Sequence, residues 1–574
     1  MVTDDQNWEL QEDIPQVEDP LIQKYLNGRN ALIQEEKKQR HDYNLRRSLS
    51  PIAARACEIV SRIRAKEQKE LWSKELNGNG DAHQTDEILY PGVMFHLAKG
   101  RMENTNLWKI VEKMPKGSLL HAHMDAMFDI DFLIEQIFST PGIHMYAPKA
   151  LLTPKDYEEA PFLFQYSTRP IQESENKPTM WSESYEPSSM INLQKAASAF
   201  PDGGEPGFKA WLRSRCVLSP EHSYFHHHGV DAIWAIFMRT FPIIGSMVNY
   251  EPIRRRCLNR LFSDLAADGI KYVEFRVAFV FQYFMTNSDT PVDGYNAFCR
   301  LFVEELEKFK ATEEGSQFFG ARIIWTTNRL LPNRGIAESM KQCIEAKKEF
   351  PGLICGFDLV NQEDLGRPLV DLIPVLLWFR KRCAEEGVEI PFMFHAGECL
   401  GDGDETDHNL FDAILLGTRR IGHGFSLYKH PLLIDLVKEK KILIECCPIS
   451  NEILRLTSSI KSHPLPALLA RGVSVSLCND DPAILGHGKN GLTHDFWQAL
   501  QGLENMGLTG LAAMVENSIR WSCYEDQTTQ EWQADLRGGV LGEGIKAARL
   551  REWYADFEKF CQWITLEFGD ELDE

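Results

Sequence analysis

The sequence contains no apolar run that approaches about 18 residues, the length at which a transmembrane helix becomes a candidate. Its first residues, MVTDDQNWELQEDIP, are acidic and polar. A secretory signal peptide needs a basic start followed by an apolar core, and this segment has neither. The sequence therefore predicts neither a membrane span nor a signal peptide, and a cytoplasmic location is expected.

The sequence has fewer basic than acidic residues. There are 62 Lys and Arg residues against 83 Asp and Glu residues, so the net charge is −21. Proteins that bind nucleic acids or anionic membranes usually present a basic face. The balance argues against both kinds of partner, although it does not exclude a local basic patch.

Paired cysteine motifs are also missing. The thirteen cysteines are an odd number, with no CxxC pair and no regular spacing. Most stand within apolar stretches, as do Cys355, Cys446, Cys447 and Cys478. A disulfide framework is not expected from such a pattern, which predicts buried free thiols.

What the chain does contain is enough apolar sequence for a large core, with 43% hydrophobic and 10% aromatic residues among 574. Beyond about residue 105, short apolar or β-branched runs alternate with stretches of helical periodicity. Eight such strand-then-helix units predict an α/β fold of the TIM type, a (β/α)8 barrel. The expected strands are GSLLHAH (117–123), IKYVEFRV (270–277), ARIIWTT (321–327), LICGFDLV (353–360), PFMFHAG (391–397), RRIGHG (419–424), KILIECCP (441–448) and VSVSLCNDDP (473–482).

Segments outside this alternation complete the predicted organisation. Residues 1–105 are predicted to form a helical arm, because SLSPIAARACEIV has a good N-terminal cap and an apolar side at helical spacing. The barrel is expected over 106–560, and 561–574 form a C-terminal end with an acidic tail. About 145 residues separate the first two strands. We therefore predict an insertion at about 139–228, over the face where barrels keep their active sites.

Histidines and aspartates stand at the C-terminal ends of four expected strands. Taken alone, each has an ordinary structural explanation, such as a hydrogen-bonded histidine or an Asp-Asp pair that caps a turn. Together they should meet at one place, because the C-terminal ends of barrel strands share one face. Three histidines and a carboxylate suit a borderline cation such as zinc. The residues are His121, His123, His395, His423, Asp480 and Asp481.

Four motifs, MPKGSLLHAHMDA, HAGE, RIGHGFSLYKHP and SLCNDDPAILG, resemble those of the metal-dependent adenosine deaminase family in the amidohydrolase superfamily. GFDLVNQED and IECCPISNEIL are most similar to its growth factor branch, of which this chain would be an intracellular member. The resemblance covers about residues 110–530. It implies zinc-dependent hydrolysis of adenosine or 2′-deoxyadenosine to the inosine nucleoside and ammonia, one zinc ion per chain, and a homodimer organised by the N-terminal arm. The zinc ligands that it implies are His121, His123, His395 and Asp480.

The same resemblance implies roles around the zinc ion. Glu398 is the expected proton shuttle, His423 is expected to orient the attacking water, and Asp480 takes part in catalysis as well as in metal binding. A tryptophan and three polar residues are the expected contacts to the purine nucleoside. They are Asp125, Trp234, Asn361 and Asp481.

Two of these substrate contacts depart from the family pattern. In the growth factor branch an aspartate directly follows the second histidine, whereas here Met124 precedes Asp125. Which carboxylate reaches the ribose therefore stays open. Asn361 stands where the family has a glycine whose backbone N–H is expected near purine N3.

The sequence leaves alternatives open. The main one is a deaminase of AMP, N6-methyl-AMP or another adenine compound, but a phosphate site should bring Lys or Arg near the first-strand loop, where Asp125 would repel phosphate. The run Arg254–Arg256 is expected on a solvated helix face, and the histidines 226–228 in a solvated loop. A two-metal amidohydrolase usually has a bridging lysine that GFDLVNQED lacks. A non-catalytic signalling protein should have lost a ligand or Glu398.

Overall fold

The computed structural model describes residues 8–9, 11–72, 90–169, 176–224, 229–280, 282–292, 294–488 and 491–572. Within them lie two four-stranded parallel sheets, in which the strands follow chain order. Each strand coincides with a run that the sequence predicts as a strand. Their bounds are β1 (Gly117–His123), β5 (Ile270–Ala278), β8 (Gly320–Asn328) and β9 (Ile354–Val360) in one sheet, and β10 (His395–Ala396), β11 (Arg420–His423), β12 (Leu443–Cys446) and β13 (Val475–Leu477) in the other.

Isolated parallel bridges join the two sheets at both edges. Phe357 of β9 pairs with Phe392, just before β10, and Ala122 of β1 pairs with Asp480, just after β13. At the second edge the amide of His123 also donates to the carbonyl of Asp480, at 2.9 Å. The eight strands therefore follow one another around a ring, and the predicted (β/α)8 fold class is confirmed.

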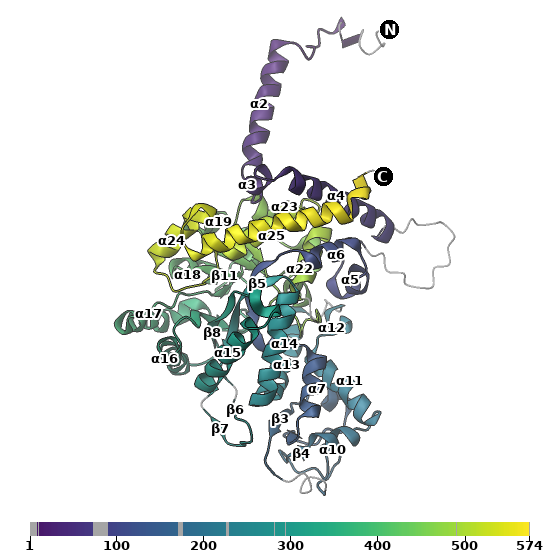
Figure 1. Cartoon of the computed structure of the whole chain (residues 1–574), viewed down its shortest axis with the longest axis vertical. Helices are drawn as coiled ribbons and strands as arrows, with labels where there is room; N and C mark the ends of the chain where they lie inside the picture. The colour runs from purple at the N-terminus through teal and green to yellow at the C-terminus, as the bar shows by residue number, and fades with distance from the viewer. Residues whose placement is uncertain are drawn as a thin grey trace, which may run out of the picture.

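The barrel strands are buried on both faces, which explains why their sequences are almost continuously apolar. In β8, for example, only the last position is not buried. Helices follow the strands and cover the outside of the ring (Figure 1). They are α15 (Gly294–Lys310), α16 (Asn333–Glu349), α17 (Leu369–Glu386), α18 (Asn409–Leu415), α19 (Pro431–Lys440), α20 (Pro448–Ile453), α21 (Leu465–Ala470), α22 (Gly491–Gly502), α23 (Leu508–Arg520), α24 (Thr529–Gly538) and α25 (Ile545–Glu567).

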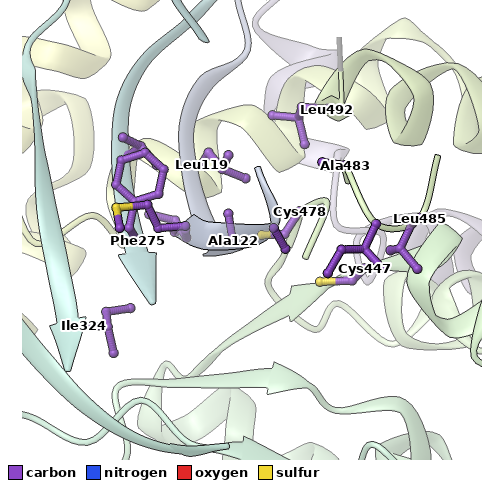
Figure 2. Close-up of a cluster of buried hydrophobic side chains, with 14 of the residues drawn as sticks. Leu119, Ala122, Phe275, Ile324, Cys447, Cys478, Ala483, Leu485 and Leu492 are labelled. Carbon is purple, nitrogen blue, oxygen red and sulfur yellow. The ribbon is translucent and has the colours of Figure 1, made fainter. Parts of the chain in front are cut away.

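Apolar side chains from different strands meet in a common core. Figure 2 shows Leu119 of β1 and Phe275 of β5 in one buried cluster with Cys478, which follows β13. All thirteen cysteines are free, and all except Cys57 are buried. The prediction of free thiols rather than a disulfide framework is confirmed.

The chain between β1 and β5 forms a second, smaller unit, at the opposite end of the molecule from helix α2 (Pro20–Lys37) (Figure 1). Its three strands make an antiparallel sheet in the order β3-β2-β4. Aromatic rings fill its interior, and the ring of Trp181 lies 5.0 Å from that of Phe200 and 5.4 Å from that of Trp211. The predicted insertion at 139–228 is thus a folded unit where it is described, while the histidines 226–228 lie outside the described residues. Its elements are α7 (Ile130–Ser139), β2 (Ile143–Tyr146), α8 (Pro154–Glu159), β3 (Leu163–Tyr166), β4 (Ile191–Asn192), α10 (Leu193–Ser198), α11 (Gly204–Cys216) and α12 (Pro220–Tyr224).

Two longer helices, α13 (Gly229–Val248) and α14 (Glu251–Ala267), lead from this unit to β5. Among the described residues, α13 is the one helix long and apolar enough to cross a membrane by length and composition, and 44% of that stretch is buried in the molecule. Core helices of soluble proteins can have the same composition, so α13 by itself does not decide between a membrane and the protein interior.

The N-terminal residues divide into a projecting helix and docked helices. No residue of α2 is buried, and this helix extends away from the barrel (Figure 1). In contrast, α4 lies along α25 and buries Ala56, Ile59 and Ile63. Ser50 caps α4 by accepting from its third residue, and the Ser50 hydroxyl donates to Glu558 of α25 at 2.8 Å. The bounds are α2 (Pro20–Lys37), α3 (Tyr43–Arg47), α4 (Pro51–Glu67), α5 (Phe95–Met102) and α6 (Asn106–Lys113).

We expect Ile59→Ala to loosen α4 from α25. Ile59 is 0% exposed, and truncating such a buried side chain costs about 2–5 kcal/mol. Ile52 lies on the same helix but is 38% exposed, so Ile52→Ala is the matched control, with an expected change within about 0.5 kcal/mol. Urea denaturation followed by tryptophan fluorescence measures both variants. Equal midpoints for the two would contradict the docking of α4.

Candidate active site

Four side chains converge at the C-terminal ends of barrel strands. His121 and His123 come from β1, His395 from β10, and Asp480 from the segment after β13. One nitrogen or oxygen atom of each lies within 4.8 Å of the corresponding atoms of the others. The Nε2 atoms of His121 and His123 are 3.1 Å and 3.4 Å from Asp480 Oδ1. The structure thus brings together the four residues that the motifs imply as metal ligands.

The chemistry of this group fits a metal ion. His121 Nε2 and Asp480 Oδ1 are buried and have no hydrogen-bond partner, although buried polar atoms nearly always have one. Burial lowers the pKa of His395 to about 3 against the opposing effect of Asp358. Burial alone would raise the pKa of Asp480, but the neighbouring histidines hold it well below its usual range. Zinc binds imidazole in its neutral form and a carboxylate in its charged form, and the shifts at His395 and Asp480 favour these forms.

Two buried carboxylates orient the histidines. His121 Nδ1 donates to Glu445 Oε2 at 2.9 Å, and His395 Nδ1 donates to Asp358 Oδ2 at 2.6 Å. Because ionised carboxylates only accept, each ring presents its Nε2 lone pair to the metal position. Arg276 donates to both carboxylates, at 2.8 Å each. Sequence analysis missed these three residues, for which the signal is a charged residue inside an otherwise apolar strand run, as in VEFRV, GFDLV and LIECC.

A cavity of about 940 Å³, counted with its open mouth, lies beside the four converging side chains. On one side its wall is formed by apolar side chains of α13, including Trp234 and Phe237. An apolar wall opposite a few convergent polar groups is typical of a small-molecule site. Of the predicted site residues only His121 does not line the cavity, since it lies fully buried behind the others. Those that do are His123, Asp125, Trp234, Asn361, His395, Glu398, His423, Asp480 and Asp481.

Glu398 is a buried carboxyl group at this cavity. Its Oε1 atom has no hydrogen-bond partner and lies 3.5 Å from His423 Nε2. Its backbone amide donates to Glu363 Oε1 at 2.8 Å, which fixes the turn. Burial, followed by the charges of Asp480 and Glu363, raises the pKa of Glu398 well above its usual range. A raised pKa favours the protonated form, in which the carboxyl group can act as an acid.

Asp481 is a second buried carboxyl group in the same cavity. It is 2% exposed, and its Oδ1 atom has no hydrogen-bond partner. Burial and then the charge of Asp480 raise the pKa of Asp481 well above its usual range. A protonated carboxyl here can donate a hydrogen bond to a ring nitrogen of a ligand.

Three cavity residues have a left-handed backbone. Their φ angles are 103° at Asn361, 61° at His423 and 60° at Asp480. For residues other than glycine such conformations cost on the order of 1–3 kcal/mol each and concentrate at functional sites. At Asn361 the positive φ is a backbone shape that favours glycine, the residue that the resemblance implies at this position.

Arg254 does not lie on a solvated helix face, so the expectation for Arg254–Arg256 was wrong for this residue. It is 4% exposed and donates to Asp125 Oδ1 at 2.7 Å and to Asn249 Oδ1 at 3.0 Å. Consecutive helix residues point about 100° apart, and α14 turns the first arginine toward the loop after β1. Arg254 therefore neutralises the charge of Asp125 beside the cavity.

Known proteins with similar sequences identify the family of this chain. The sequence model of the family described as adenosine deaminase matches residues 218–536, more than half of the chain. Adenosine deaminase 2 of Sus scrofa is 32% identical over 480 residues, which are 83% of this chain and 85% of that protein. The adenosine deaminase of Lutzomyia longipalpis is 32% identical over 451 residues, 77% and 81% of the two chains.

A more distant likeness exists among solved structures. The N6-mAMP deaminase of Arabidopsis is 15% identical and covers 75% of this chain and 99% of its own, with a TM-score of 0.47. That superposition is too loose to bear on the substrate. The sequence matches, in contrast, cover most of the chain and confirm the resemblance that the motifs indicate. The chain belongs to the adenosine deaminase family and is a deaminase of the hydrolase class.

Proposed function

We propose that the protein hydrolyses adenosine and 2′-deoxyadenosine to inosine and 2′-deoxyinosine, with release of ammonia. The observation that carries the proposal is the carboxyl group of Glu398, which has a raised pKa and is buried at the same cavity as the four converging metal-type donors. Deamination of an adenine ring needs water to add at C6 and a proton to reach a ring nitrogen. In this cavity Glu398 can supply the proton, and the four metal-type donors can hold the ion that activates the water.

One zinc ion per chain is proposed, held by His121, His123, His395 and Asp480. Zinc at such a site lowers the pKa of a water toward ~7. The proposed metal identity is supported by the three imidazoles and one carboxylate of the donor set, and by the two partnerless buried atoms that face each other there.

Two side chains transfer the protons of the reaction, and a third orients the ring. Glu398 donates to purine N1 while the attacking water adds to C6, and Asp480 takes one proton of that water. Asp480 passes this proton to the amino group, the C6–N bond breaks, and ammonia leaves. The remaining hydroxyl proton returns to Glu398 as the C6 carbonyl forms. Asp481 donates a hydrogen bond to purine N7 and orients the ring.

The surroundings of the cavity favour a neutral ribose over a phosphate. Among the described residues that line the cavity, Arg276 is the only Lys or Arg. Its guanidinium group is already hydrogen-bonded to two buried carboxylates. Nearby, Arg254 is paired with Asp125. In the loop after β9, burial and four neighbouring carboxylates raise the pKa of Asp364 to about 6, a sign of strong negative potential. A phosphate would be repelled here.

Turnover of a substrate panel tests this assignment. We expect adenosine and 2′-deoxyadenosine to have the highest kcat/KM among adenosine, 2′-deoxyadenosine, AMP, N6-methyl-AMP and adenine. Release of ammonia, or of methylamine from the methylated nucleotide, measures each reaction. A preference for AMP or N6-methyl-AMP would refute the nucleoside assignment and support the alternative substrates.

Glu398→Gln should abolish most activity without loss of metal. A neutral amide has nearly the same shape but cannot shuttle a proton, and loss of general acid catalysis typically costs ~10²–10⁴ in rate. His395→Ala is the comparison variant, since it should lose zinc and activity together. Elemental analysis and adenosine turnover measure both. A Glu398→Gln protein with full zinc and near-normal turnover would exclude the proposed mechanism.

We also propose a homodimer that forms through α2. On this helix Leu21, Tyr25 and Leu32 are 67%, 68% and 73% exposed. Their spacing of four and seven residues places them on one side of the helix. Large apolar side chains grouped on a projecting helix are typical of an association surface, and the dimer implied by the resemblance uses the same arm.

The double variant Leu21→Lys, Leu32→Lys is therefore expected to be monomeric. The pair Asn30→Lys, Gln34→Lys adds the same charge on the opposite side of α2 and should leave the dimer intact. Light scattering at micromolar concentration measures the mass of each protein. A monomeric wild-type protein, or two variants with the same mass, would contradict the proposed surface.

A further inference from the structure

The hydrogen bonds behind His423 determine which of its nitrogens carries the proton. They begin at the backbone amide of Leu465, which donates to His463 Nδ1 at 3.0 Å. A backbone N–H has no acceptor capacity, so His463 Nδ1 must be the accepting nitrogen. Burial lowers the pKa of His463 to about 3. The ring is therefore neutral, and its one proton is on Nε2.

Asn451 is the next group in this chain of hydrogen bonds. His463 Nε2 donates to Asn451 Oδ1 at 3.0 Å, which turns the amide nitrogen of Asn451 toward His423. Asn451 Nδ2 then donates to His423 Nδ1 at 3.0 Å. The exposed fractions of Asn451, His463 and His423 are 0%, 5% and 2%. Rotating the amide by half a turn would break both hydrogen bonds between buried groups, which is costly.

His423 is left with one possible arrangement. Its Nδ1 accepts from Asn451 and therefore carries no proton, so the ring is neutral. The single proton is on Nε2, which lies 3.5 Å from Glu398 Oε1 and 3.7 Å from Asp480 Oδ2. In this form Nε2 can donate a hydrogen bond but cannot accept a proton.

We propose that Asn451 and His463 are positioning residues that hold His423 as the Nε2–H tautomer, so that His423 donates a hydrogen bond to the attacking water and does not act as its base. The water's proton then has Asp480 as its acceptor: one O–H bond of the water breaks as a bond to a carboxylate oxygen forms. The catalytic consequence rests on the proposed function, whereas the tautomer can be observed without any substrate.

Asn451→Asp is the most direct test. A carboxylate only accepts, so it should draw the His423 proton to Nδ1 and leave a lone pair on Nε2. We expect kcat for adenosine to fall by ~10²-fold or more, with KM within a few-fold and the zinc content unchanged. In protein labelled with ¹⁵N-histidine, the NMR shifts of His423, assigned by comparison with His423→Gln, should change from the Nε2–H to the Nδ1–H pattern or to that of the imidazolium.

A matched pair at His463 separates positioning from packing. His463→Gln keeps an N–H donor at about the position of Nε2 and should retain most of kcat and the wild-type His423 spectrum. His463→Leu fills similar space without a donor, so the Asn451 amide can rotate, and it should lower kcat and mix the two tautomers. These two variants keep the test decisive if Asn451→Asp does not fold.

Three outcomes would overturn the proposal. They are an Nδ1–H pattern for His423 in the wild-type protein, wild-type kcat in Asn451→Asp, and equal kcat in the two His463 variants. If the wild-type protein does not deaminate adenosine, the proposed function fails, but the NMR patterns still decide the tautomer. Each failure can thus be told from the other.

Discussion

The active site depends on the ion pairs that Arg276 makes at the centre of the barrel. Its guanidinium lies between Asp358 and Glu445, and each of these carboxylates fixes one metal-facing histidine. Arg420 extends the network, bonding to Glu445 at 2.5 Å and to Glu274 at 2.6 Å. Burying charges costs solvation, and removing one partner from such a network costs about 3–5 kcal/mol because a bare charge remains. Barrel packing and site geometry are therefore held by the same contacts.

This shared set of contacts explains how strained residues persist at the cavity. The charged groups come from β5, β9, β11 and β12, so the network forms only when these strands lie in register. Once it forms, the strand ends are fixed, and the left-handed backbones of His423 and Asp480 are imposed by their surroundings. Preorganised polar groups need little rearrangement during the reaction, which is how such sites stabilise developing charge.

The strands and the converging donors were predictable because each depends on local sequence. Parallel barrel strands are apolar runs, and their C-terminal ends share a face, so the positions of His121, His123, His395 and Asp480 along the chain are enough to group them. The network around Arg276 was not predicted, because residues in a run that is buried on both faces give no periodicity to show which ones meet inside the ring.

Two other features depended on tertiary contacts that the sequence does not display. Arg254 looks like its two neighbours in sequence and is buried only because α14 packs against the loop after β1. The insertion is rich in polar residues, yet Trp181, Phe200 and Trp211 are brought together from distant positions to form its interior. Aromatic residues within a polar segment are the signal that could have indicated a folded unit.

The protonation states of the cavity are mutually dependent, and this makes the chemistry possible at one pH. The pKa of Asp480 is lowered, and the charge of Asp480 is in turn a cause of the raised pKa values of Glu398 and Asp481. Like charges this close in a buried site are not ionised together. One carboxyl group with a lowered pKa and two with raised pKa values therefore coexist in one cavity, while His423, whose Nδ1 accepts from Asn451, can hold a water through its Nε2–H without taking a proton from it.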